Sequence, residues 1–203
     1  GSRFTRIGTM RAITFDIESI SDSAVRGRVD VNEQELTVVA VHDSTTDSYT
    51  SYTKEELPLL WPLLESANLL IGFNSNNFDI PLLNRYYPGD LTRIPSLDLL
   101  EEVQKVLGRR IRLQSLGEAT LKKGKTGDGL IAQEWWRAGD HEKVRKYCIE
   151  DVRLTRALYD YAKTNGILKY KELRTIRDIK LDTSLWEHPE TRVAPILTHA
   201  LQL

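Results

Sequence analysis

The sequence predicts a mixed α/β fold, in which helices cover both faces of one sheet. Three observations lead to this prediction: β-rich segments open the chain, helical and β-rich segments then alternate, and the longest helical pattern comes last before a short tail. Strands joined by short turns favour antiparallel pairing, whereas strands separated by helices favour parallel pairing. We therefore expect three antiparallel strands followed by parallel ones.

The length of 203 residues suits a single domain, because one hydrophobic core can grow to roughly 250 residues before a chain divides. We expect residues 1–9 to be the remnant of an expression tag, since Gly1-Ser2 has the form of a protease-cleavage scar and Met10 fits a natural start. Residues 10–203 are then expected to form one domain.

The first part of the predicted sheet is a three-stranded meander. Residues 12–17, 36–41 and 48–52 are rich in β-forming residues and predict its strands. Polar residues predict a loop over 20–34, and Asp, Ser and Thr gather in a turn over 43–47.

A helix is predicted next, because Thr53-Lys54-Glu55-Glu56 forms a capping box. This helix should extend to residue 67, although Pro62 should kink or shorten it. Residues 69–73 form a short apolar run of the kind found inside a parallel sheet. A turn over 74–77 and a helix over 78–86 follow.

Strands and helices continue to alternate in the second half of the chain. The predicted elements are a strand over 93–97, a helix to Leu107 with Asp98 as its cap, a short helix over 115–121, a Gly-rich stretch over 124–129, a helix over 131–138, the longest helix over 141–164 and extra strands over 167–181. Apolar residues roughly keep helical spacing through the longest helix, and Gly166 ends it.

Charge and composition exclude several classes of protein. The net charge is −1, from 28 basic and 29 acidic residues, whereas proteins that coat nucleic acid are often strongly basic. Near-neutrality still permits an enzyme whose acidic site offsets a basic groove. No apolar run approaches the roughly 18 residues of a membrane-spanning helix. A single cysteine, Cys148, excludes a disulfide framework, and with no secretory signal we expect a cytoplasmic protein without a membrane partner.

Four carboxylates and one tyrosine are the candidate functional residues. Asp16 and Glu18 lie two apart at the end of the first strand, so their side chains point to one face and can share an ion. Asp79 lies where the fourth strand turns into a helix, at the edge where sites form in α/β sheets. Tyr147 and Asp151 are four apart and therefore neighbours on one helix face.

These residues fall within three segments that resemble, in the same order, the three exonuclease motifs of the DEDD superfamily. The segments are Thr14-Phe-Asp-Ile-Glu-Ser19, Ile71-Gly-Phe-Asn-Ser-Asn-Asn-Phe-Asp-Ile-Pro-Leu-Leu83 and Tyr147-Cys-Ile-Glu-Asp-Val-Arg-Leu154. The third has the tyrosine form, DEDDy, and the set is most similar to the proofreading exonuclease domain of family B DNA polymerases. The resemblance covers roughly residues 11–165. It implies a ribonuclease H-like fold with a C-terminal extension over 167–203.

The candidate carboxylates predict a site for divalent cations. Close carboxylates repel one another and need cations to neutralise them, and oxygen ligands suit hard ions such as Mg²⁺ or Mn²⁺. The resemblance implies two such ions, with Asp16 bridging both. It further implies that Glu18 and Asp151 complete the first site. Asp79 is then expected to hold the second ion, partly through water.

The resemblance also implies a reaction and a substrate. Tyr147 would orient the attacking water, since a phenol with a pKa of about 10 is a poor base at neutral pH. Asn74 matches a family position that contacts the terminal nucleotide. We expect a 3′–5′ exonuclease that acts on single-stranded DNA or an unpaired 3′ end and releases nucleoside 5′-monophosphates.

Three alternatives remain open at this point. An RNA 3′-exonuclease of the ribonuclease D kind shares the tyrosine motif. The amino-acid sequence of residues 74–79, however, is more similar to the second motif of the DNA polymerase relatives. A non-catalytic nucleic-acid-binding module is the second alternative, and a cluster of negative charge argues against it. The chain could also be a fragment or subunit of a larger assembly, whose protein partner the sequence does not show.

Other residues carry two interpretations each. The stretch from 105 to 125 could track phosphates or form a solvated helix face; its basic residues are Lys105, Arg109, Arg110, Arg112, Lys122, Lys123 and Lys125. Trp135 and Trp136 could stack on bases, but burial of at least one is the safer expectation. Cys148 is expected to be a small buried residue on a different helix face from its catalytic neighbours.

Overall fold

The computed structural model describes residues 10–21, 30–123 and 129–188. The predicted tag, part of the predicted loop over 20–34 and most of the Gly-rich stretch lie outside the described residues, as does Lys125. Within these ranges no helix is long and apolar enough to cross a membrane.

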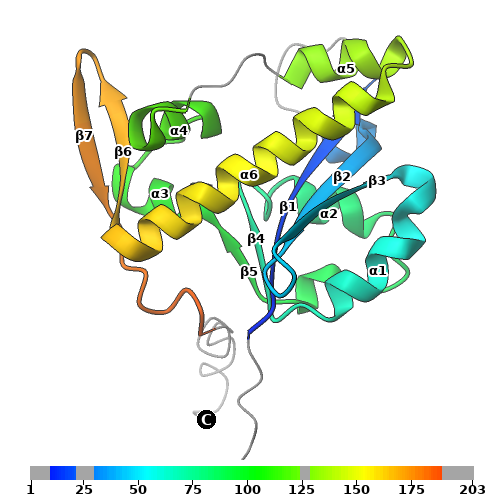
Figure 1. Cartoon of the computed structure of the whole chain (residues 1–203), viewed down its shortest axis with the longest axis horizontal. Helices are drawn as coiled ribbons and strands as arrows, with labels where there is room; N and C mark the ends of the chain where they lie inside the picture. Colours follow the sequence, from blue (N-terminus) through cyan, green and yellow to red (C-terminus); the bar gives the residue numbers. More distant parts are fainter. Residues whose placement is uncertain (1–9, 22–29, 124–128, 189–203) are drawn as a thin grey trace, which may run out of the picture.

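One five-stranded sheet organises the structure, in the order β3-β2-β1-β4-β5 (Figure 1). Its strands are β1 (Ala12–Ile20), β2 (Glu35–Asp43), β3 (Ser48–Thr53), β4 (Leu69–Gly72) and β5 (Ser96–Asp98). The first three pair antiparallel, and β4 and β5 run parallel to β1. The predicted mixed sheet is confirmed, and β1 is its central strand.

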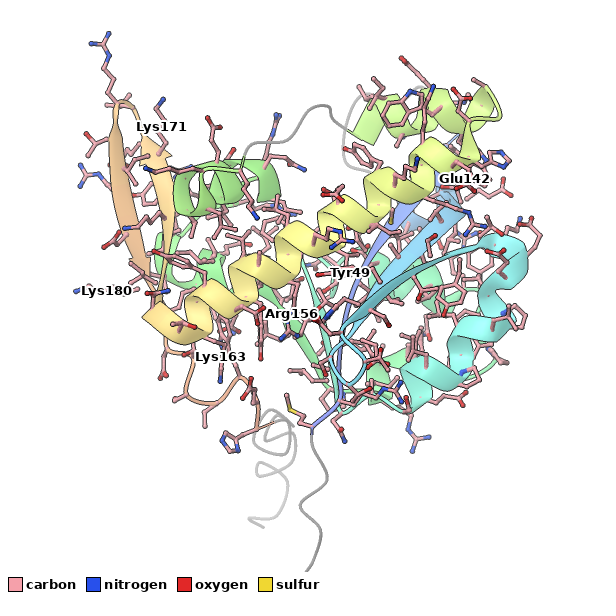
Figure 2. The ribbon with its side chains drawn as sticks, viewed as in Figure 1. Tyr49, Glu142, Arg156, Lys163, Lys171 and Lys180 are labelled. Carbon is pink, nitrogen blue, oxygen red and sulfur yellow. The ribbon has the colours of Figure 1, made fainter. Side chains whose placement is uncertain are left out.

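Helices and a second, two-stranded sheet complete the chain. They are η1 (Val31–Glu33), η2 (Lys54–Glu56), α1 (Leu57–Glu65), α2 (Asp79–Asn84), η3 (Leu91–Arg93), α3 (Leu99–Leu107), α4 (Leu113–Leu121), α5 (Gly129–Arg137), α6 (His141–Asn165), β6 (Ile167–Glu172) and β7 (Thr175–Lys180). Helix α6 runs diagonally across one face of the sheet (Figure 1), and Glu142 and Lys163 lie near its two ends (Figure 2).

Alternation along β1 divides the core between the two faces of the sheet, as the period of a strand requires. Ile13, Phe15 and Ile17 are buried in a cluster with residues of α1 and α2. Ala12, on the other face, belongs to a cluster with residues of α6. Both faces are therefore covered by helices, and the side chain of Asp16 falls on the α6 face.

Several predicted elements differ from the structure at their boundaries, and in two of them the structure shows the physical reason. The predicted strand over 93–97 is wrong at its start, because Asp90 caps a short 3₁₀ helix by accepting a hydrogen bond from the Thr92 N–H. Pairing with β4 begins only at Ser96. The predicted helix over 53–67 is divided into η2 and α1 and ends at Glu65, three residues after Pro62, whose ring has no N–H to bond.

The C-terminal extension packs into the main core. The side chain of Trp186 is fully buried, and its ring stacks on Tyr159 of α6 with ring centroids 5.4 Å apart. Its indole N–H donates to Glu102 on α3 at 3.3 Å. The predicted extra strands are confirmed as the hairpin of β6 and β7, and residues 181–188 connect this hairpin to α3 and α6.

Replacing Trp186 with Ala should destabilise the protein by about 3–5 kcal/mol, the usual loss for a buried aromatic residue. Leu185→Ala is the matched control, because that neighbouring side chain is 52% exposed. This variant should lower the free energy of unfolding by no more than about 0.5 kcal/mol. Urea denaturation followed by circular dichroism measures both. Equal losses in the two variants would contradict this role for Trp186.

Candidate active site

The end of β1 brings two of the predicted carboxylates together. Asp16 and Glu18 lie on one face of the strand, and their carboxylate oxygens and the Cys148 sulfur lie within 4.8 Å of one another. Glu18 is buried, whereas Asp16 is half-buried. The prediction that these two side chains can share an ion agrees with this geometry.

Cys148 is buried, as expected, but its predicted separation from the carboxylates is wrong. Its sulfur lies 3.3 Å from the main-chain oxygen of Asp16 and 3.6 Å from Oδ2 of the same residue. Cys148 and Asp151 are three apart in α6 and so share a side of the helix, and α6 packs directly over β1. Burial, together with the charges of Asp16 and Glu18, raises the pKa of the thiol well above its usual value. The thiol is therefore neutral beside the carboxylates.

Asp79 joins the site through the main chain of β1. Strand β4 pairs with β1 only as far as Thr14, so the Ile17 N–H that points to the β4 side has no strand partner there. Oδ1 of Asp79, the first residue of α2, accepts a hydrogen bond from this N–H at 3.0 Å. The early end of β4 thus leaves room for a carboxylate beside the central strand.

The pKa of Asp79 is raised to about 7. Burial is the main cause, and the negative charges of Asp98 and Asp151 add to it. Its hydrogen bonds from the main chain, including that from Ile17, act in the opposite direction but are outweighed. A divalent cation at this position would remove the unfavourable burial of negative charge.

A tight turn after β4 carries the predicted nucleotide contact, Asn74. A Cβ at Gly72 would overlap the side chain of Ser75, so the turn needs glycine there. Asn74 adopts the left-handed conformation with φ of 60°, which Asn tolerates better than most residues. Asp98 holds the turn by accepting hydrogen bonds from the N–H groups of Asn74 and Asn76 at 2.7 and 3.0 Å.

Asp98 was predicted only as a helix cap, and this role is confirmed by its hydrogen bond from the Leu100 N–H at 2.9 Å. Its second role, in the Asn74 turn, was missed. Parallel pairing places the end of β5 beside the end of β4. The signal that could have found this role is the position of Asp98 at the end of a strand next to the motif-bearing strand.

Helix α6 supplies Tyr147 and Asp151, and both side chains are buried. Asp151, Asp16 and Asn74 line one open cavity of about 830 Å³. The indole ring of Trp135 contacts the Tyr147 ring edge-on, with centroids 5.9 Å apart. The structure therefore brings Asp16, Asp151 and Asn74 into one cavity. Glu18 and Asp79 join them through β1, and Tyr147 lies one helical turn from Asp151.

The expectation that at least one of the two tryptophans is buried is wrong, because Trp135 and Trp136 are both only partly exposed. Trp136 stacks on His141 with ring centroids 3.9 Å apart. Each ring thus has an aromatic neighbour within the protein, which explains the position of α5 against the start of α6.

The donor set at the end of β1 fits hard divalent cations. The carboxylates of Asp16, Glu18, Asp79 and Asp151 offer oxygen ligands, and such ligands suit Mg²⁺ or Mn²⁺. The neutral thiol of Cys148 adds no thiolate that would favour a soft metal. The raised pKa of Asp79 shows that the protein without cations disfavours the charge at this position.

Comparisons with known proteins agree with the fold of this chain. A family model described as the RNase_H superfamily matches residues 14–163. Among 166 matching chains of solved structures is the family B DNA polymerase from the hyperthermophilic archaeon Pyrobaculum calidifontis, with a TM-score of 0.61 and 17% sequence identity. The match covers 76% of this chain and 25% of the polymerase chain. No curated protein matches the sequence.

Asp79 should make the stability of the cation-free protein depend on pH. Its pKa is about 7 in the folded protein against an ordinary value of 3.8, so the folded state binds more protons than the unfolded state between these values. The contribution of this group to stability is therefore fully present below about pH 4 and is lost as pH rises through about 7. Asp79→Asn keeps an acceptor for the Ile17 N–H but cannot ionise, so its stability relative to wild type should rise across this range.

Thermal unfolding in chelator at pH 4 to 8 measures this difference. Glu118→Gln is the control, because Glu118 is an exposed carboxylate on α4. Adding Mg²⁺ or Mn²⁺ at pH 8 should stabilise wild type more than Asp79→Asn. If the difference in unfolding temperature between wild type and Asp79→Asn stayed constant with pH, it would contradict the raised pKa assigned to Asp79.

Proposed function

Because this chain belongs to the RNase_H superfamily, we propose that it is a 3′–5′ exonuclease that depends on two divalent cations. The RNase H-like fold indicates a nuclease and hence a nucleic acid substrate. The observation that best supports the finer proposal is the joining of Asp16, Asp151 and Asn74 in one open cavity. These residues come from the three segments that resemble the DEDD exonuclease motifs.

Four carboxylates would hold the cations. Asp16 would contact both, because its carboxylate lies within 4.8 Å of that of Glu18 and it lines the same cavity as Asp151. Asp79 would contact the second ion. When bound, two such cations stabilise the attacking and leaving oxygens of a phosphoryl displacement.

Side chains around the carboxylates would position the reactants. The Tyr147 hydroxyl would orient the water, whose oxygen forms a bond to phosphorus. The bond from phosphorus to the 3′ oxygen of the preceding nucleotide breaks, and that oxygen takes up a proton. Asn74 would contact the terminal nucleotide, which leaves as a nucleoside 5′-monophosphate.

DNA is the proposed substrate, as a single strand or an unpaired 3′ end. The sequence of residues 74–79, which is more similar to the DNA polymerase relatives, supports DNA over RNA, and one solved structure of similar fold is that of a DNA polymerase. This chain corresponds to a quarter of that polymerase, so a polymerising module, if one acts with this chain, would come from elsewhere in a longer protein or from a partner.

Asp16→Ala and Asp151→Ala should each lower the exonuclease rate by at least about 100-fold, because loss of even an indirect contact to a metal ligand can cost 10- to 100-fold. Asp160→Ala is the control, since this exposed residue lies on α6 as Asp151 does. Gel assays of a labelled oligonucleotide under Mg²⁺ or Mn²⁺ give the rates. Unchanged rates in both variants would exclude the mechanism, and binding without cleavage by wild type would support a binding module instead.

The direction and sugar preference can be tested with one set of oligonucleotides. A single strand labelled at its 3′ end should release labelled mononucleotide at once, whereas the same strand labelled at its 5′ end should shorten step by step. Chelator should stop both reactions, because the carboxylates need cations to hold the phosphate. Faster digestion of RNA than of DNA of the same sequence would favour the ribonuclease D kind of enzyme.

A further inference from the structure

We propose that Arg109, Arg110 and Arg112 bind the backbone phosphates of a single strand whose 3′ end lies at Asp16 and Asp151. The inference rests on the proposed function and assigns its substrate-binding surface. All three arginines lie in the segment between α3 and α4, within the basic stretch of the sequence.

The strongest support is shared location. The cavity of about 830 Å³ that Asp16 and Asp151 line is also lined by all three arginines. Sites for small ligands measure roughly 300–1,000 Å³, so this cavity can hold a short piece of a strand. A phosphate chain that leaves the carboxylates through this cavity would therefore pass the guanidinium groups.

The three arginines are exposed and available to a ligand. Among the described residues, none of them forms an ion pair with a carboxylate. In the same part of the chain Arg93 and Arg174, outside the cavity, are likewise without such a pair, so the location of the three arginines beside the carboxylates carries the argument. Arginines that do pair with a carboxylate are Arg11, Arg145, Arg153, Arg156 and Arg177. Unpaired guanidinium groups beside a cavity suit phosphates, which they bind through two parallel hydrogen bonds.

Local contacts hold two of these side chains over the cavity. The guanidinium of Arg109 lies over the ring of Tyr170, 5.5 Å from its centroid. Arg110 donates a hydrogen bond to Oδ1 of Asn74 at 2.8 Å. Arg110 thus connects the proposed phosphate surface to the residue expected to contact the terminal nucleotide.

The start of α4 adds to the positive potential. Arg112 is the N-cap residue of this nine-residue helix, and its side chain offers no acceptor for the first N–H groups. Leu113, Gln114 and Ser115 of the first turn line the same cavity. The partial positive charge of a helix N-terminus favours anions, so this end of α4 reinforces the arginines.

The triple variant R109A/R110A/R112A tests the proposal. Phosphate contacts to single strands change log K by about 0.7 per contact for each tenfold change in salt. Three lost contacts amount to about 2 log units for each tenfold change in salt. The variant should therefore lower the salt slope by about 2 and raise KM for a single-stranded oligonucleotide by about 100-fold in 0.1 M salt, relative to its effect in 1 M salt. The matched control is K54A/R93A/K163A, which removes three charges outside the cavity; Lys163 lies near the C-terminal end of α6 (Figure 2).

Two further probes separate this proposal from the proposed function. The p-nitrophenyl ester of thymidine 5′-monophosphate offers only the scissile phosphodiester. The double variant R109A/R112A, which keeps the hydrogen bond from Arg110 to Asn74, should therefore cleave it within about twofold of wild type, because the carboxylates and the Asn74 contact are intact. Failure of wild type to cleave either substrate would overturn the exonuclease assignment. The phosphate site would still be tested by fluorescence anisotropy with the same oligonucleotide.

Oligonucleotides with uncharged methylphosphonates at internal positions identify the ligand. Wild type should bind these methylphosphonate strands as weakly as the triple variant binds normal strands. The triple variant should bind methylphosphonate strands and normal strands with equal affinity. DNA and RNA strands should show equal losses, because phosphate contacts carry no base information. The charge-conserving variant R109K/R110K/R112K should retain most of the affinity, which excludes misfolding as the cause. Equal KM and salt slope for wild type and the alanine triple variant would overturn the proposal in favour of a solvated basic surface.

Discussion

The burial of acidic side chains around the end of β1 is the constraint on which the rest of this structure depends. Asp16 and Glu18 share one face of the strand, Asp79 hydrogen-bonds to its main chain and Asp151 faces the same cavity. Burial and neighbouring charge raise the pKa of Asp79 to about 7. Such a group is unfavourable in the folded protein unless cations neutralise it. At neutral pH and above, the folded protein therefore contains a buried negative charge that either a proton or a bound cation would neutralise.

Several elements depend on that constraint. Strand β4 stops short and leaves the Ile17 N–H for Asp79, while Asp98 at the end of β5 fixes the turn that presents Asn74. The same cavity is lined by positive charges as well, those of the arginine segment. The net charge of −1, from 28 basic and 29 acidic residues, thus conceals an uneven local distribution of charge. It is compatible with the proposed binding to nucleic acid, because bound cations would reverse the sign at the carboxylates.

The features that follow from local periodicity and capping could be predicted from the sequence. The alternation of β1 placed Asp16 and Glu18 on one face, and the capping residues Asp98 and Gly166 were located correctly. The position of Cys148 could not be obtained in this way, because it depends on how α6 crosses the sheet. The second role of Asp98 depends likewise on the pairing of β5 with β4. Features that arise between elements distant in sequence were therefore the ones missed.

The C-terminal extension connects the two sides of the cavity. It lies beyond the residues matched by the family model, which ends at 163, yet Trp186 stacks on Tyr159 of the helix that carries Asp151. The Thr120 hydroxyl of α4 donates to the Lys169 carbonyl of β6 at 3.2 Å and accepts from the Lys169 N–H at 2.9 Å. Since α4 begins at the arginine segment, β6 links that segment to α6. The described part of the extension is thus positioned to keep the arginines and the carboxylates at a fixed separation, which the proposed binding of one strand to both would require.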